Sequence, residues 1–225
     1  MRRPSVIFFD VNETLLDLKP VKKAVAEALG DRPDLVPLWF TMMLQYSLVT
    51  TVADRYRDFG EIAVACLRMV ARNYGNNIDE TVAKNAVARM RCLPPHPDVV
   101  TALEHLRDAK YRLLALTNSS DAVAGDQLKN AGLDELFEAV SSVEGVGLYK
   151  PHAHVYRWAA RRAGVDVSEC LLVAAHGWDV AGASWAGMRS AFVSRPGQQQ
   201  FPLGPKPELA VATLDELAEK LAILP

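Results

Sequence analysis

The 225-residue sequence predicts an α/β fold in which a parallel sheet forms the core and an all-helical segment is inserted near the start of the chain. Short apolar runs of strand length recur, and a segment of helical character separates each run from the next, which is typical of a parallel sheet. Residues 17–93 show only helical spacing and contain no convincing strand. Half of the residues are apolar, which is ample for a hydrophobic core.

The apolar runs are the expected strands. They are Val6–Phe9, 111–116, 171–174, 190–193 and, as a short edge strand, Leu209–Val211. Helices are expected at 99–109, 122–131 and 214–221. Residues 96–98 open the first of these helices and Ser119 with Ser120 opens the second, while Gly132 and Gly164 suit the left-handed position that follows a helix.

The inserted segment has helical apolar spacing in the stretches 21–29, 35–48, 62–71 and 81–90. The chain is therefore expected to form a core domain from residues 1–16 and 94–225 and a helical domain from residues 17–93. Both junctions lie beside the end of the first expected strand. A helical domain attached there is placed to act as a lid over that edge of the sheet.

Charge and composition restrict the expected partners. The formal net charge is −2 with acidic and basic residues well mixed, so the sequence predicts no nucleic-acid surface and no polybasic membrane patch. No stretch is expected to span a membrane, and the apolar run after Arg3 is too short for a signal peptide. We expect a cytoplasmic protein that binds a small molecule. The cysteines have no metal-site spacing and are expected as small core residues: Cys66, Cys92 and Cys170.

Asp10 is the most informative residue, because it directly follows the first apolar run. Open α/β sheets bind ligands at the carboxyl ends of their strands, so this carboxylate is placed as a nucleophile. The alternative is an aspartate that ends the strand and caps the next turn. Three later segments favour the nucleophile: 116–120 (LTNSS), 149–151 (YKP) and 174–179 (AAHGWD).

These four segments, in this order and spacing, resemble the four motifs of the haloacid dehalogenase (HAD) superfamily. The stretches 10–17 (DVNETLLD) and 178–183 (WDVAGA) are most similar to its 2-haloacid dehalogenase branch, and the resemblance extends from residue 5 to about residue 195. It implies a Rossmann-like HAD core with the helical segment as its cap domain. It also implies hydrolysis of short 2-haloacids to 2-hydroxy acids through an ester on Asp10.

The residue at position 12 favours dehalogenation over phosphate transfer. Phosphatases of this superfamily carry a second aspartate two residues after the nucleophile, because an alkoxide leaving group needs a proton. A halide needs none, and this chain has Asn12 there. Ala175 stands where the first acidic metal ligand of the fourth motif would fall, so we expect no metal and no cofactor.

Lys150 is expected to balance two carboxylates. Asp10 and Asp179 would repel each other unless a cation lies between them. By resemblance, Lys150 keeps Asp10 ionised and helps to hold the substrate carboxylate, while Asp179 anchors Lys150 and positions or activates the hydrolytic water. The alternatives are an ordinary surface lysine and, for Asp179, the N-cap of the following helix.

The resemblance implies roles for further residues. Thr14 and Asn118 are expected to hydrogen-bond the nucleophile or the substrate, and with Asp10, Lys150 and Asp179 they complete the expected catalytic set. Ser119 and Ser120 are expected as helix caps. The expected substrate-binding residues are Val11, Asn12, Trp39, Phe40, Leu44, Gln45, Thr117, Tyr156, His176 and Trp178.

The sequence departs from the branch at the halide site and at the water site. Phe40 stands where the branch has an arginine that captures the halide; Arg55 and Arg57 are candidate replacements, with solvated surface charges as the alternative. Ala174 and His176 stand where the branch has the serine and asparagine that place the water. His176 titrates near neutral pH and is a candidate for the water site; the alternative is a histidine bonded to backbone at a helix start.

Two other functions stay open at this point, a magnesium-dependent phosphatase of a small phosphorylated metabolite and a non-catalytic binder with this fold. Asn12 and Ala175 weigh against the phosphatase, and the retention of the catalytic set weighs against the binder. The expected partners are a small-molecule substrate and a second copy of the chain in a homodimer.

Overall fold

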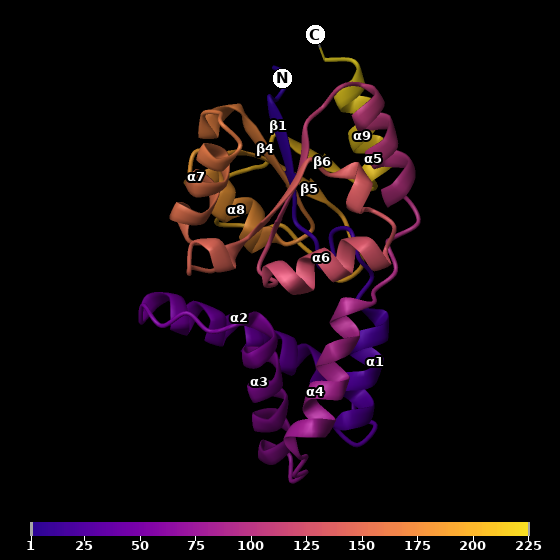
Figure 1. The fold of residues 1–225 in the computed structure, drawn as a ribbon, viewed down its shortest axis with the longest axis vertical. Helices are drawn as coiled ribbons and strands as arrows, with labels where there is room; N and C mark the ends of the chain where they lie inside the picture. Colours follow the sequence, from indigo (N-terminus) through magenta and orange to yellow (C-terminus); the bar gives the residue numbers. More distant parts are fainter. Residues whose placement is uncertain (1, 225) are drawn as a thin grey trace.

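The computed structural model describes residues 2–224. Its core is a six-stranded sheet with the order β3-β2-β1-β4-β5-β6, and the paired strands are parallel (Figure 1). The strands are β1 Val6–Phe9, β2 Leu113–Thr117, β3 Ala139–Ser142, β4 Cys170–Ala174, β5 Arg189–Val193 and β6 Leu209–Val211. β1 is central and fully buried, as expected of a continuous apolar run in a sheet covered on both faces.

Helices cover both faces of this sheet. α5 and α9 pack together on one side of it, while α7 and α8 lie on the other side, with α8 against β4 and β5 (Figure 1). The core helices are α5 Val99–Asp108, α6 Asp121–Asn130, α7 Ala153–Arg162, α8 Gly177–Trp185 and α9 Leu214–Ala222. The predicted α/β core is confirmed.

A second group of helices lies beyond the carboxyl ends of the strands (Figure 1). α1 packs on α4, α4 on α3, and α3 on α2. Their bounds are α1 Lys19–Ala28, α2 Val36–Val52, α3 Phe59–Asn73 and α4 Glu80–Ala88, with short 3-10 helices at Pro33–Leu35 and Arg89–Arg91. The helical prediction for this stretch is confirmed, and we propose residues 17–93 as the bounds of the cap domain.

The strand β3 was not predicted. It lies at an edge of the sheet, its first two residues are only partly buried, and two serines follow them. A short edge strand of this composition has no continuous apolar run, so hydropathy alone does not reveal it. It pairs in parallel with β2, from Leu114 opposite Ala139 to Thr117 opposite Ser142.

Two expectations about apolar segments are wrong. The stretch 33–52 is long and apolar enough to cross a membrane by length and composition alone, with a mean hydropathy of 1.3 and 33% of that stretch buried. In the fold, Trp39 and Met43 of this stretch are fully buried within the cap, while α2 extends sideways beyond the other cap helices (Figure 1). Cys92 is exposed, unlike the buried Cys66 and Cys170.

Candidate active site

The carboxyl ends of three adjacent strands bring the predicted residues together. β1 lies between β2 and β4, where the chain order reverses, and this is where open α/β sheets bind ligands. Asp10 follows β1, Asn118 follows β2 and His176 lies two residues after β4. Lys150 comes from the loop between β3 and α7.

Lys150 is a buried lysine that joins two carboxylates. Its Nζ donates to Asp10 Oδ1 at 2.8 Å, to Asp179 Oδ2 at 2.7 Å and to the carbonyl oxygen of Leu116 at 2.9 Å. These bonds use all three donors of the ammonium group. The side chain is fully buried, so the alternative of a surface lysine is wrong.

Asp179 is held on both oxygens, by Lys150 on Oδ2 and by the hydroxyl of Tyr156, which donates to Oδ1 at 2.6 Å. Burial raises the pKa of Asp179, although Lys150 opposes the shift. The N-cap of α8 is His176, so Asp179 lies in the first turn and is not the cap. Gly182 permits this packing, because a Cβ there would lie 2.8 Å from the Tyr156 hydroxyl.

The second oxygen of Asp10 has different partners. The Thr14 hydroxyl donates to Oδ2 at 2.7 Å, and the same hydroxyl oxygen accepts from the backbone N–H of Ala175 at 2.9 Å. His176 Nδ1 lies 3.1 Å from Oδ2. Burial raises the pKa of Asp10, but Lys150 and His176 outweigh burial and hold that pKa well below its ordinary value. Asp10 is therefore an ionised carboxylate, as a nucleophile must be.

His176 lies between two carboxylates, because its Nε2 is 2.9 Å from Glu13 Oε2. Burial lowers the pKa of His176, but the hydrogen bonds to Asp10 and Glu13 raise it to about 9. The ring is an imidazolium at neutral pH, bonded to side chains rather than to backbone. Glu13 was missed in the sequence analysis; the only signal was an acidic residue between the nucleophile and Thr14.

Asn118 and Thr117 support the loops around the site. Asn118 Oδ1 accepts from the backbone N–H of Lys150 at 3.1 Å, which ties the lysine loop to the end of β2. The Thr117 hydroxyl oxygen accepts from the backbone N–H of Ser119 at 3.1 Å. Both residues are buried beside Asp10's strand, and so is Val11.

Asn12 is engaged by neighbours other than Asp10. Its Nδ2 donates to the Ser119 hydroxyl at 3.2 Å, and its Oδ1 accepts from Gln127 Nε2 at 2.9 Å. Gln127 Nε2 also donates to the carbonyl oxygen of Met90 at the end of the cap. Ser119 is therefore no helix cap, and Ser120 occupies the N-cap position of α6 without a side-chain hydrogen bond. The buried side-chain amides of Asn12 and Gln127 therefore link the Asp10 loop to α6 and to the end of the cap.

A hollow of ≈ 850 Å³ lies between cap and core, and Glu13 and His176, which line it, separate it from Asp10. Four predicted substrate-binding residues line it: Phe40, Leu44, His176 and Trp178. The rings form a stack, with centroids 6.4 Å apart for Phe40 and His176 and 5.1 Å apart for His176 and Trp178. Phe40 and Leu44 share one helix face, since residues four apart do so.

Two predicted pocket residues of the same helix lie elsewhere. Trp39 is buried inside the cap, where its Nε1 donates to the carbonyl oxygen of Ala63 at 2.9 Å. Gln45 is exposed. Neither lines the hollow, because their positions on α2 face α3 and solvent. Arg55 and Arg57 are also exposed, as solvated surface charges would be, so they do not replace the missing arginine.

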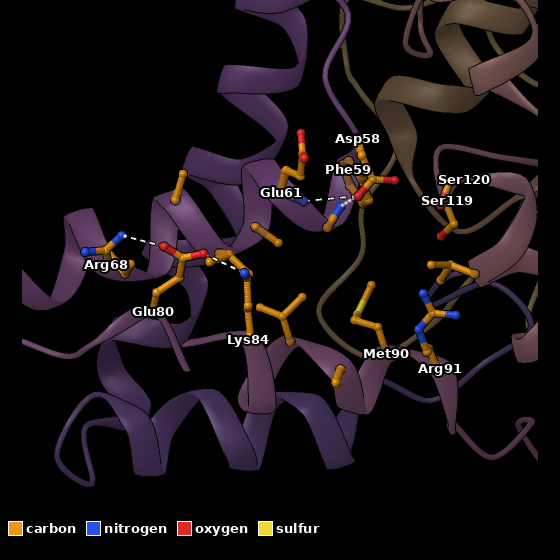
Figure 2. A pocket seen from close by; sticks show the side chains of 17 residues that line it. Asp58, Phe59, Glu61, Arg68, Glu80, Lys84, Met90, Arg91, Ser119 and Ser120 are labelled. Carbon is orange, nitrogen blue, oxygen red and sulfur yellow. Dashed lines mark hydrogen bonds and ion pairs between the residues drawn. The ribbon is translucent and has the colours of Figure 1, made fainter. Parts of the chain in front are cut away.

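A second hollow of ≈ 580 Å³ lies between α3 and α4 of the cap and the start of α6 (Figure 2). Phe59 and Met90 face Ser119 and Ser120 across it (Figure 2). At its cap end Glu80 lies between Arg68 and Lys84. Asp10 lines neither hollow, and this second one also lacks Glu13 and His176, which line the first.

The acidic residues do not form a metal centre. Within residues 2–224 there is no group of three or more histidine, cysteine, aspartate or glutamate side chains that could hold a metal ion. The ammonium group of Lys150 occupies the space between Asp10 and Asp179, and the neighbouring Ala175 offers no side-chain ligand. Mg²⁺ prefers several oxygen ligands in octahedral geometry, which this arrangement does not offer.

Comparisons with known proteins agree with one another. A family model described as haloacid dehalogenase-like hydrolase matches residues 4–187. The chain is 29% identical to haloacetate dehalogenase H-2 of Moraxella sp. (strain B), over 99% of this chain and 100% of that protein. The structure of L-2-haloacid dehalogenase from Xanthobacter autotrophicus superposes with a TM-score of 0.91 at 25% identity, covering 99% of this chain and 100% of that one. A dehalogenase solved with an intermediate complex gives 0.87 at 28% identity, covering 99% of both chains.

Proposed function

The chain belongs to the haloacid dehalogenase-like hydrolases, and from this premise we propose that it converts short 2-haloacids to 2-hydroxy acids through an ester on Asp10. One observation carries the proposal. Asp10 is ionised, buried and compensated by Lys150, while Asn12, at the position of a phosphatase's acid, is bound to Ser119 and Gln127.

In the first step a carboxylate oxygen of Asp10 attacks the α-carbon from the side opposite the halogen. The C–O bond forms as the carbon–halogen bond breaks, the halide leaves with the bonding electrons, and the α-carbon inverts. Lys150 keeps Asp10 charged, and because its three N–H donors are engaged by Asp10, Asp179 and Leu116 it offers no hydrogen bond to the substrate carboxylate. Thr14 fixes one nucleophile oxygen. The halogen departs as an anion, so the step needs no proton donor. The dehalogenase solved with an intermediate complex supports this covalent route.

In the second step water cleaves the ester and restores Asp10. Both oxygens of Asp179 are occupied, by Lys150 and Tyr156, so Asp179 serves as the anchor of Lys150. His176 is then the group placed to activate water, since its Nδ1 faces Asp10 and its ring lines the hollow. In the resting site the Asp10 and Glu13 carboxylates raise the pKa of His176 to about 9, so an imidazole suits this role once the ester has removed the charge of Asp10.

The hollow at the cap–core seam is the proposed substrate entrance. Phe40, Leu44 and Trp178 supply an apolar wall there. Asn118 and Thr117 lie at the end of the neighbouring strand, and their proposed role is to bind the halide or the substrate carboxylate. Tyr156 acts through Asp179. Trp39 supports α2 from inside the cap, and the exposed Gln45 has no role in this proposal.

The test is release of halide from chloro-, bromo- and fluoroacetate and from 2-chloropropionate, measured beside phosphate release from a generic phosphoester. Each assay is run with chelator and with added Mg²⁺. We expect halide release that chelation leaves unchanged, because Lys150 rather than a metal balances the carboxylates. Phosphate release restored by Mg²⁺, without halide release, would establish the phosphatase instead.

The mixed surface charge and the small-molecule site support a cytoplasmic enzyme without a nucleic-acid or membrane partner. The exposed apolar side chains of Leu48, Val49 and Val52 on α2 support a homodimer. Light scattering of the purified chain measures the oligomeric state directly.

A further inference from the structure

Glu13 is a buried carboxylate beside the proposed active site, and neither step of the proposed reaction involves it. Its backbone has a φ of 63°, in the left-handed region that a residue with a side chain rarely adopts. Its Oε2 lies 2.9 Å from His176 Nε2 and accepts from Gln198 Nε2 at 2.9 Å, while its Oε1 accepts from Lys22. The carboxylate is held from three directions, which offsets the backbone strain.

The partners of Glu13 come from separate parts of the chain. Lys22 lies on α1, the first helix of the cap, and Gln198 lies on the polar loop after β5. His176 belongs to the core, and its ring is enclosed by Phe40 of the cap and Trp178 of the core. Glu13 therefore contacts the cap through Lys22, the polar loop through Gln198 and the core through His176.

We propose that Glu13 orients His176 as the base of the hydrolytic step, and that Lys22 makes this alignment depend on a seated cap. This inference rests on the proposed function, because it assumes an ester on Asp10. Glu13 and Lys22 are positioning residues, since both act through His176. A water that attacks the ester then meets an activated base only when the cap covers the site.

The charge of Asp10 sets when His176 can act. In the resting enzyme His176 is protonated, since its bonds to Asp10 and Glu13 raise its pKa to about 9 against the effect of burial. Esterification removes the charge of Asp10, so the pKa of His176 falls and the ring releases a proton to solvent. Glu13 stays ionised, because its bonds from His176 and Lys22 outweigh burial and lower its pKa.

The protons balance over the cycle. Neutral His176 takes a proton from water as the water oxygen bonds to the Asp10 carbonyl carbon. The ester C–O bond then breaks, the product alkoxide takes the proton from His176, and the Asp10 carboxylic acid returns its own proton to His176. One proton and one halide leave per turnover, as hydrolysis of a carbon–halogen bond requires.

The charged groups nearest to His176 are two carboxylates, and each of these is paired with a lysine on its other side. Asp10 and Glu13 contact the ring directly, Lys150 lies on the far side of Asp10, and Lys22 lies on the far side of Glu13. His96 contacts the backbone carbonyl of Glu13 rather than its side chain. Lys23, Glu27 and Asp31 are exposed residues that also line the hollow.

The test separates the two half-reactions. Glu13→Gln and Lys22→Met are mixed with 2-bromopropionate in a rapid-quench experiment, and the mass of the peptide containing Asp10 is recorded. We expect a normal burst of one bromide per site, then steady turnover about 10- to 100-fold slower for Glu13→Gln and about 10-fold slower for Lys22→Met. The ester should accumulate on Asp10 in both variants.

Two further variants, Lys19→Met and Lys22→Arg, serve as controls for the loss of the Lys22 charge. Lys19→Met alters a lysine of the same helix that is 87% exposed and pairs with Asp17, and it should leave both phases unchanged. Lys22→Arg should recover most of the steady rate. If Glu13→Gln slows burst and turnover equally without ester, the orienting role is wrong. If Lys22→Met matches Lys19→Met, the cap link is wrong. If the unmodified enzyme releases no halide from any haloacid, the proposed function itself fails.

Discussion

The two oxygens of Asp10 face different environments. On the Oδ1 side, Lys150, Asp179 and Tyr156 form a fully buried chain that belongs entirely to the core. On the Oδ2 side, His176 and Glu13 connect the core to the cap and to a hollow that opens on solvent. One side is built to hold a fixed charge, and the other is built to exchange a proton.

This difference follows from the charged partners of each cation, since Lys150 and His176 are both buried. A lysine with all three donors engaged between two carboxylates has no reason to lose its proton, and its pKa is raised despite burial. The imidazolium of His176 instead depends on a charge that the reaction itself removes. The two halves of the reaction therefore use opposite sides of one carboxylate.

Removing the nucleophile tests both sides at once. Asp10→Asn should lower turnover by on the order of 10⁴-fold or more, because an amide of nearly the same size is a poor nucleophile. Halide release and circular dichroism of the purified variant measure activity and fold. In heavy-oxygen water, a single turnover of the unmodified enzyme should label Asp10 before product. Label that enters product alone would mean that water attacks the substrate directly.

The Oδ1 side is tested by removing its cation. Lys150→Ala should cost roughly 10²- to 10³-fold in kcat/KM, because two buried carboxylates then face each other without compensation. Tyr156→Phe removes only one hydrogen bond to Asp179 and should cost about tenfold. Equal, small effects of the two changes would contradict the charge-balancing role.

The Oδ2 side is tested by the pH dependence of stability. The pKa of His176 is raised from 6.5 to about 9, so its contribution to folding is fully present below about pH 6.5 and is lost as pH rises through about 9. The stability advantage over His176→Asn should shrink by on the order of 3 kcal/mol across that window. Urea denaturation at several pH values measures the difference. His154→Asn, on an exposed residue of α7, is the control; a parallel loss there would contradict the assignment.

The smallest expected effect concerns Phe40, which lies over the ring of His176. An aromatic ring offers a leaving halide little stabilisation, whereas a preorganised cation offers much. Phe40→Arg should therefore raise halide release from 2-chloropropionate by a few-fold, up to about tenfold. If the variant stays folded but loses activity, Phe40 shapes the substrate pocket and the halide is bound by other donors.

The sequence determined the residues of the Oδ1 side and the overall architecture. Strand-length apolar runs, their spacing and the four motif segments were sufficient to predict the α/β core, the helical insertion and the meeting of Asp10, Lys150 and Asp179. Apolar runs and motif segments are each contained in one short stretch of sequence, and residues that follow parallel strands meet at one edge of the sheet. Lys150 and Asp179 do not follow strands directly, and the resemblance to the family placed them beside Asp10.

The contacts on the Oδ2 side of Asp10 depend on the tertiary structure. Glu13 gave no motif, and its pairing with His176 depends on a left-handed backbone, on Lys22 from the cap and on Gln198 from a polar loop. The sequence of α2 likewise predicts a helix but not which of its faces lies on the core. Phe40 and Leu44 line the hollow, whereas Gln45 is exposed to solvent. These contacts join segments far apart in the sequence, and they depend on how the cap packs on the core. Hydropathy and residue spacing within one segment do not predict that packing.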